Sequence, residues 1–204
     1  MTLAAFLSAW AIHLVAAASP GPAVLMSARI AVTEGLRSAL WLAIGLGLGA
    51  LCWAVAALFG LALLFKVAPA LFIGFKLAGA LFLIWIAIQM WRHAEDPLPE
   101  AKEGVAPRGV LSAIWLGIAT QLANPKPAVF FGAVFVGTVP PDTSAAWLLL
   151  LLAAIFANEV ACNIIVARLF SFDRSRRAYS RLKATIDRCF GGALALLGVK
   201  IAAT

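Results

Sequence analysis

The chain alternates between long apolar stretches and short polar connections. A helix needs roughly 20 apolar residues to cross a bilayer, and six stretches are that long or close to it. They cover about residues 3–30, 38–65, 70–91, 109–139, 145–167 and 188–203, the last being the shortest. This pattern predicts an all-α integral membrane protein with six transmembrane helices and no soluble domain.

The first and fourth stretches contain the same short proline phrase. Residues 20–24 read PGPAV and residues 125–129 read PKPAV. Proline removes a backbone donor and clashes with the preceding turn, so helices 1 and 4 are both expected to be broken. Paired interruptions at matching places in two halves of a chain indicate the binding site of a transporter.

The placement of the basic residues predicts how the helices are oriented. Twelve of the 16 lysine and arginine residues fall in the connections after the first, third and fifth stretches. Because basic connections favour the cytoplasmic face, both termini are expected outside. Three spans per half then make two inverted three-helix repeats, residues 1–91 and 109–204. A proline-containing linker, residues 92–108, joins them into a single transmembrane domain over residues 1–204.

Composition supports a membrane location. The chain is 64% hydrophobic and 12% charged, against about 45–50% and about 25% in soluble domains. Its net charge of +7 could indicate nucleic-acid binding. The basic residues, however, lie at the ends of apolar stretches, which favours orientation in a bilayer. We therefore expect no nucleic-acid partner.

Few polar side chains lie within the apolar stretches, and these are the candidate site residues. An ionisable residue at the bilayer centre costs about 2.5–3.5 kcal/mol on insertion scales, so each should face the bundle interior. The candidates for substrate binding are the two breaks and the polar residues of the fourth and fifth stretches: Ser19, Pro20, Gly21, Pro22, Gln121, Asn124, Pro125, Lys126, Asn158, Glu159 and Asn163.

Glu159 is the sharpest candidate. It could carry a coupling proton or bind a substrate ammonium, and the alternative is a structural ion pair with Lys126. Asn163 lies one helical turn on and could hydrogen-bond its carboxylate. Lys126 in turn could contact a substrate carboxylate or act as a gate, and the alternative is a lysine that extends toward the interface. His13 is a second proton-coupling candidate or a packing residue.

Ser19 and Asn124 occupy the same position in the two breaks. Both are favoured N-cap residue types, so we expect them to cap the half-helices that follow. The N-terminus of a half-helix attracts anions through its free N–H groups and its dipole. The same geometry would therefore present donors to a carboxylate.

Gly45 and Gly49 lie four residues apart in the second stretch. Small residues at this spacing let a second helix approach closely. The partner could be another helix of the chain or a second subunit, so a homodimer is possible.

Together these motifs resemble the LysE/RhtB superfamily of amino-acid exporters over essentially the whole chain. The resemblance is carried by residues 19–22, 124–126 and 76–85, with Gly35 and Arg37 after the first stretch. It implies efflux of amino acids or related metabolites across the bacterial inner membrane, driven by the proton gradient. The chain departs from the family pattern in two site positions. Glu159 stands where an aspartate is common, and Pro127 follows the Asn-Pro-Lys core.

We expect a secondary transporter that exports a small amino acid in exchange for protons. A single acid at membrane depth favours a neutral zwitterion over a basic amino acid. The alternatives are a passive channel and an exporter of basic amino acids. An intramembrane enzyme is disfavoured, because only His13 and Glu159 offer acid–base chemistry. No metal-ligand spacing is present, so we expect neither a metal nor another cofactor.

Overall fold

The computed structural model describes residues 1–58, 69–96, 106–124, 126–127, 130–131, 138–140 and 142–203. These residues form helices and connections, and no strand is found among them. The helices are α1 (Leu3–Ala18), α2 (Pro22–Thr33), α3 (Leu36–Ala56), α5 (Pro69–Arg92), α6 (Val110–Ala123), α9 (Ala145–Phe170) and α10 (Asp173–Ala203). The all-helical prediction is confirmed for this part of the chain.

The first apolar stretch is broken where its prolines predict a break. Helices α1 and α2 are separated by three residues and meet at a bend of 53°. Pro22 begins α2, a position where the missing N–H of proline costs nothing. In the fourth stretch α6 ends at Ala123, with Asn124 as its C-cap. Both expected helix ends are therefore present, while Pro125 lies outside the described residues.

The described helices include clear membrane-crossing candidates. Helices α3 and α9 are long and apolar enough to cross a bilayer, and the bent pair α1 and α2 is a third candidate if it is one span. Helix α6 is a shorter apolar helix of 14 residues. These lengths and compositions agree with a helical membrane protein.

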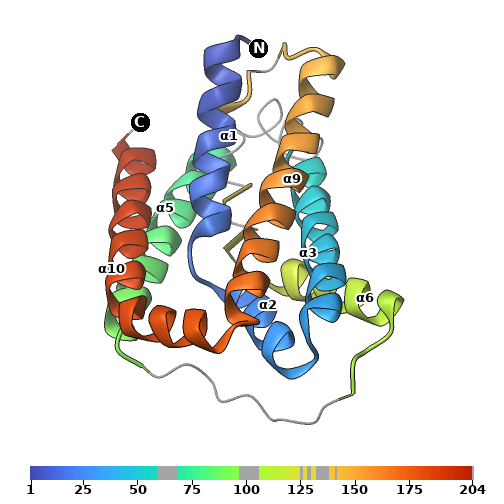
Figure 1. Cartoon of the computed structure of the whole chain (residues 1–204). Coiled ribbons are helices and arrows are strands. Elements are labelled where there is room, and N and C mark those ends of the chain that lie inside the picture. The colour runs from blue at the N-terminus through green and yellow to red at the C-terminus, as the bar shows by residue number, and fades with distance from the viewer. Residues whose placement is uncertain are drawn as a thin grey trace.

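The sixth helix begins much earlier than the hydrophobic pattern predicts. We expected a basic connection before residue 188, but α10 runs over 31 residues from Asp173, and only Ser171 and Phe172 separate it from α9. Its basic half crosses the foot of the bundle before the helix turns upward beside α5 (Figure 1). Arg188 reaches Glu95 at 2.7 Å and so joins this half to the end of α5. The hydrophobic pattern does not predict the first half of α10, because that half is polar and basic.

Helices α3 and α6 pack so closely that their backbones are in contact. A Cβ atom added at Gly45 would lie 2.1 Å from the carbonyl oxygen of Ile114, and one at Gly117 would lie 2.3 Å from that of Leu42. Gly49 meets the side chain of Gln121 in the same way. The partner of the Gly45–Gly49 face is thus a helix of the same chain, and this face gives no support to a homodimer.

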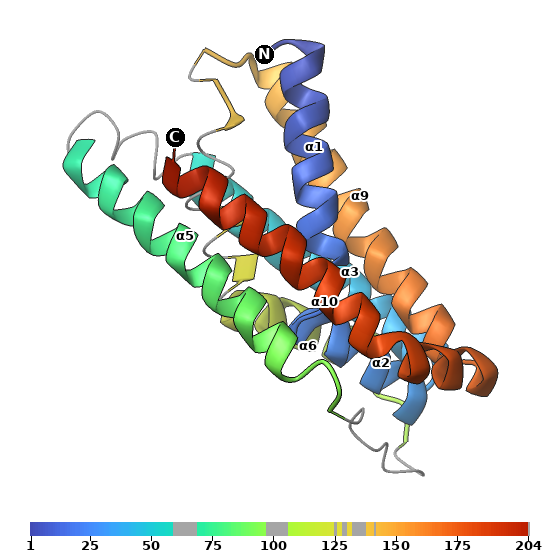
Figure 2. The ribbon, with the colours of Figure 1, turned by 90° about the vertical axis from the view of Figure 1, so that its left-hand side faces the viewer.

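Helices α5 and α10 lie side by side and antiparallel in both views (Figures 1 and 2). A Cβ atom at Gly198 would lie 2.9 Å from the Ala80 carbonyl oxygen, and one at Gly191 would lie 3.1 Å from that of Ala87. Glycine thus lets the two backbones come close. The pair packs through Ala80, Leu83, Ala87 and Leu194 into the same apolar core as α1, α3 and α9.

A buried ion pair fastens the end of α2 to the start of α6. Arg108 Nε donates to both carboxylate oxygens of Glu34, at 2.9 and 2.8 Å, and the Arg108 backbone N–H donates at 3.2 Å. Glu34 is 7% exposed. The side-chain hydrogen bond from Arg108 is the main reason that the pKa of the Glu34 carboxyl is held below its usual range. Sequence reasoning missed this pair, whose members are 74 residues apart.

Glu34→Gln is expected to lower the free energy of unfolding by about 1–3 kcal/mol near neutral pH, the range for a hydrogen bond to a charged group. Because the folded-state pKa of Glu34 is depressed, the ion pair stabilises above the unfolded-state pKa and is lost as pH falls through the folded-state pKa. The difference between wild type and variant should therefore shrink in acid. Unfolding of detergent-solubilised protein at several pH values measures it. The control is Glu95→Gln, whose exposed pair with Arg188 is expected to contribute less than about 1 kcal/mol. A pH-independent difference at Glu34 would contradict the assignment.

Candidate functional site

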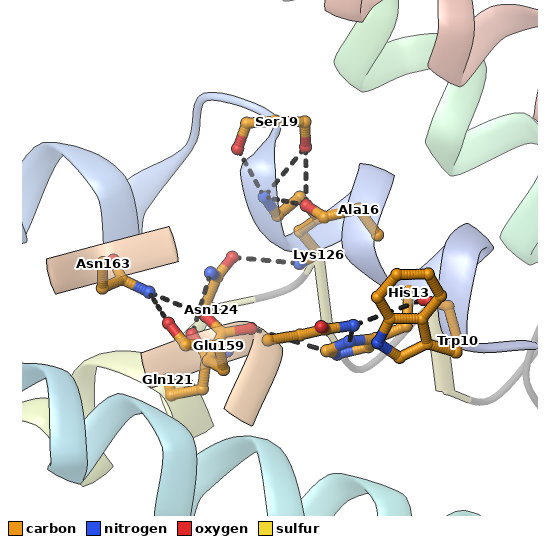
Figure 3. Close-up of polar contacts among 10 residues, drawn as sticks. Trp10, His13, Ala16, Ser19, Gln121, Asn124, Lys126, Glu159 and Asn163 are labelled. Carbon is orange, nitrogen blue, oxygen red and sulfur yellow. Dashed lines mark hydrogen bonds and ion pairs between the residues drawn. The ribbon is translucent and has the colours of Figure 1, made fainter. Parts of the chain in front are cut away.

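The two breaks meet through the side chain of Lys126. Its Nζ donates to the carbonyl oxygens of Ala16 and Ser19, at 2.9 and 2.8 Å, and to Ser19 Oγ at 3.0 Å. Lys126 is 7% exposed and Ser19 is fully buried. Figure 3 shows the lysine pointing to the end of α1. The second break therefore supplies an ammonium group to the first.

Ser19 does not cap the helix that follows it, which corrects our expectation. It is the C-cap of α1, and its Oγ donates to the Ala16 carbonyl oxygen at 2.8 Å. The N-cap of α2 is Gly21, which has no side chain to accept a bond. Asn124 behaves differently, since its Oδ1 accepts the Lys126 backbone N–H at 3.1 Å. The two breaks thus have unequal local chemistry despite their shared phrase.

Glu159 lies buried on α9, at 4% exposure. Asn163 Nδ2 donates to Glu159 Oε1 at 3.2 Å, as the i, i+4 spacing predicted. Ser27 Oγ of α2 in turn donates to Asn163 Oδ1 at 2.8 Å. Among the described residues, the group at ion-pair distance from Glu159 is His13, with 4.0 Å between Nε2 and Oε2. Lys126 is bonded to the end of α1 instead. A direct ion pair between Lys126 and Glu159 is therefore not formed in this structure.

His13 is held between α9 and two aromatic rings. Asn158 Nδ2 lies 3.3 Å from His13 Nδ1 and 3.3 Å from the Trp10 carbonyl oxygen. Since an amide nitrogen can only donate, Nδ1 is the acceptor and the ring proton of a neutral His13 sits on Nε2, toward Glu159. The rings of Phe130 and Phe131 lie 5.5 and 5.6 Å from the imidazole. His13 and Glu159 thus form an oriented pair.

A small open cavity adjoins these groups, and its interior of about 20 Å³ has room for about one water molecule. Helices α1, α6 and α9 and the second break contribute to its wall, which consists of His13, Ala16, Ala17, Gln121, Lys126, Pro127, Phe130, Phe131 and Glu159. The residues of the first break, 19–22, are not among these lining residues. The second break and α9 thus face the last turns of α1, rather than the first break itself, across one space. Gln121, placed from sequence as a possible lining residue, is part of the wall.

The remaining candidates shape the site without lining it. Asn158 and Asn163 hold His13 and Glu159. Gly21 passes close to the lysine, since a Cβ atom there would lie 3.4 Å from Lys126 Nζ. Pro20 lies between α1 and α2, and Pro22 begins α2.

The cavity therefore offers an ammonium, a carboxylate and an imidazole. These groups can bind a zwitterion and hold or release a proton. In the part of the chain that the structure describes, no group of three histidine, cysteine, aspartate or glutamate residues could hold a metal ion.

Sequence reasoning missed the backbone contribution of Ala16 and the role of Ser27. Both side chains are small and common, so residue type gave no signal. For Ala16 the four-residue spacing to Pro20 was a usable signal. The carbonyl of residue 16 would bond to the N–H of residue 20 in a continuous helix, and residue 20 is a proline. The carbonyl is therefore free for another donor.

Comparison with known proteins gives a consistent result over the whole chain. A family model described as LysE type translocator matches residues 14–204. The threonine efflux protein of Escherichia coli K12 is 32% identical over 204 residues, covering 96% of each chain. That of Salmonella typhi is 32% identical over 196 residues, covering 93% of each chain. The uncharacterised membrane protein YahN of E. coli K12 is 24% identical, covering 90% of this chain and 82% of its own. No solved structure matches.

Proposed function

Because the chain belongs to the LysE type translocator family, we propose that it exports a small neutral amino acid in exchange for protons. Threonine is the first candidate substrate, since two relatives that match nearly their full length are named threonine efflux proteins. The site of translocation is the cavity that α1, α9 and the second break enclose. Amino-acid export is what the family membership supports; the neutral substrate and the proton coupling are our inference from the site.

One observation carries the proposal: Lys126 and the Glu159–His13 pair face the same cavity from different helices. Lys126 would bind the substrate carboxylate. Glu159 would carry the coupling proton, with His13 as its partner. A buried carboxylate whose charge changes during the cycle can couple proton entry to substrate release, because ionisable groups at membrane depth are costly unless paired.

The same residues favour a neutral substrate. A basic amino acid would bring a second cation into the cavity, and among the described residues that line it the one carboxylate is that of Glu159, beside the lysine of the second break. A neutral zwitterion leaves Glu159 to the coupling proton, whereas a second cation would compete with the proton for that carboxylate. Gln121 on the cavity wall could add a hydrogen bond to a polar side chain.

We further propose six membrane spans in two inverted repeats, residues 1–91 and 109–204, joined by residues 92–108 in one domain. Two features support this arrangement. Both chain ends lie at one end of the bundle, and the α9–α10 turn lies at the other (Figure 1). The helix ends that lie at that second end carry arginine, with Arg37 in the first turn of α3 and Arg92 and Arg168 in the last turns of α5 and α9 (Figure 1). Under the positive-inside rule this end faces the cytoplasm of a bacterial inner membrane, and both termini face outward.

Transport by purified protein in proteoliposomes tests the function. We expect a pH gradient to drive accumulation of labelled threonine against its concentration gradient, and excess unlabelled threonine to inhibit it. Lysine should compete at least about tenfold less well, the effect of an unfavourable 1.4 kcal/mol. Equal competition by lysine would contradict the neutral-substrate assignment. Flux that neither saturates nor responds to the gradient would indicate a passive channel instead.

A further inference from the structure

The ammonium of Lys126 is fully hydrogen-bonded in this structure. An ammonium has three donors, and the oxygen atoms of Ala16 and Ser19 provide three acceptors at 2.8–3.0 Å. We call these acceptors, the two carbonyl oxygens and Ser19 Oγ, the α1 cradle. Lys126 cannot bind a substrate carboxylate with good geometry while its donors are all used here. Substrate binding through Lys126 therefore requires the lysine to leave the cradle.

The cradle is built by the break itself. Pro20 has no N–H group, so the Ala16 carbonyl lacks its normal helical donor. The Ser19 carbonyl lies beyond the end of α1, where the helix dipole is negative and favours a cation. When Lys126 leaves, Ser19 Oγ still donates to the Ala16 carbonyl, but the Ser19 carbonyl loses Lys126 as its donor, and leaving a buried acceptor without a donor costs about 1–3 kcal/mol. When Lys126 leaves, another cation should take its place.

We propose that the cradle is the subsite for the substrate's primary ammonium group, and that Lys126 occupies it only when no substrate is bound. This inference rests on the proposed function. The incoming ammonium replaces the lysine in the cradle, and the released lysine pairs with the substrate carboxylate. The cradle acceptors then receive hydrogen bonds from the substrate ammonium, and the Lys126 ammonium donates to the substrate carboxylate instead.

The position of the cradle makes this exchange possible. Ala16 and Lys126 both line the cavity that a substrate would enter. Glu159 is less suited to hold the ammonium, because Asn163 donates to Oε1 and His13 faces Oε2. The exchange leaves Glu159 free to carry the proton. It also favours a ligand with both groups, because the substrate carboxylate pairs with the displaced Lys126, whereas an amine alone would leave Lys126 to compete with the proton for Glu159.

The test compares threonine with 1-aminopropan-2-ol, the same molecule without its carboxylate, by titration calorimetry of detergent-purified protein. Wild type should prefer threonine by at least about 30-fold, the effect of losing one hydrogen bond between charged groups. In Lys126→Met no lysine ammonium occupies the cradle, and the substrate carboxylate has no lysine to pair with. The amine should therefore bind at least about tenfold tighter than it binds wild type, and the preference for threonine should fall to about threefold or less.

A gain in amine affinity is not expected from a purely structural lysine. Lys183→Met removes a lysine at the distant basic half of α10 and should keep the wild-type preference. Lys126→Gln retains a polar group near the cradle, and the same shift of smaller size is expected if Lys126→Met does not fold. Folded Lys126 variants with unchanged or weaker amine binding would overturn the proposal. A different outcome would separate the two proposals. If wild type binds no amino acid but Lys126→Met gains amine binding, the proposed function is overturned, while the assignment of the cradle as an ammonium subsite stands.

Discussion

Glu159→Gln is expected to abolish threonine accumulation driven by a pH gradient while leaving threonine exchange active. Glutamine has nearly the same shape and still accepts a hydrogen bond from Asn163 at Oε1, so the site should stay assembled. It cannot take up and release a proton. Gradient-driven accumulation should fall at least about 100-fold, which is the scale on which the loss of a proton-transfer group acts. Exchange of labelled for unlabelled threonine needs no net proton movement and should persist.

The two assays on the same proteoliposomes separate coupling from folding. Asp142→Asn is the control, because Asp142 is an exposed acid in the turn before α9 and should transport as wild type does. Accumulation by Glu159→Gln at the wild-type level would remove Glu159 from the coupling mechanism. Loss of exchange together with accumulation would show that Glu159 is needed for substrate binding rather than for coupling alone.

Pro20→Ala is expected to impair export without destabilising the protein. Alanine restores an N–H group at residue 20 that can bond to the Ala16 carbonyl, as in a continuous helix. The added bond is worth about 0.5–1.5 kcal/mol, so the melting temperature should hold or rise. The cradle loses one acceptor to the helix, and α1 extends into the break. Export should fall at least about tenfold, the effect of 1.4 kcal/mol on a single binding step.

Export from cells and melting of purified protein together check this result. Pro140→Ala is the matched control, because Pro140 is exposed and lies outside the helices. It should change neither quantity appreciably. An active Pro20→Ala protein, or one that is inactive because it unfolds, would contradict the view that the break provides free carbonyls for function.

The breaks could be predicted from sequence because proline acts locally. Its effect on the backbone depends on the residues within one turn, and the ends of α1 and α6 follow from it. The i, i+4 bond between Asn163 and Glu159 was predictable for the same reason. The partner of Lys126 was not, because it depends on how two helices 110 residues apart in the chain pack together.

Two other differences have physical explanations. The first half of α10 is polar and basic, and a hydrophobicity window cannot tell such a helix from a loop. The expected N-cap role of Ser19 was wrong, because a serine hydroxyl at a break can either accept from the helix that follows or donate to the helix that precedes it. The free carbonyl of Ala16 lies three residues before it and accepts its proton. The spacing between residue 16 and Pro20 was the signal that would have favoured this outcome.

We propose that the cavity lined by α1, α9 and the second break is the substrate site. An experimental structure of the protein with threonine bound tests it most directly. We predict threonine among His13, Gln121, Lys126 and Glu159, with Lys126 drawn away from the end of α1. Threonine bound elsewhere, for instance along the α5–α10 pair, with Lys126 still bonded to Ala16 and Ser19, would contradict the account.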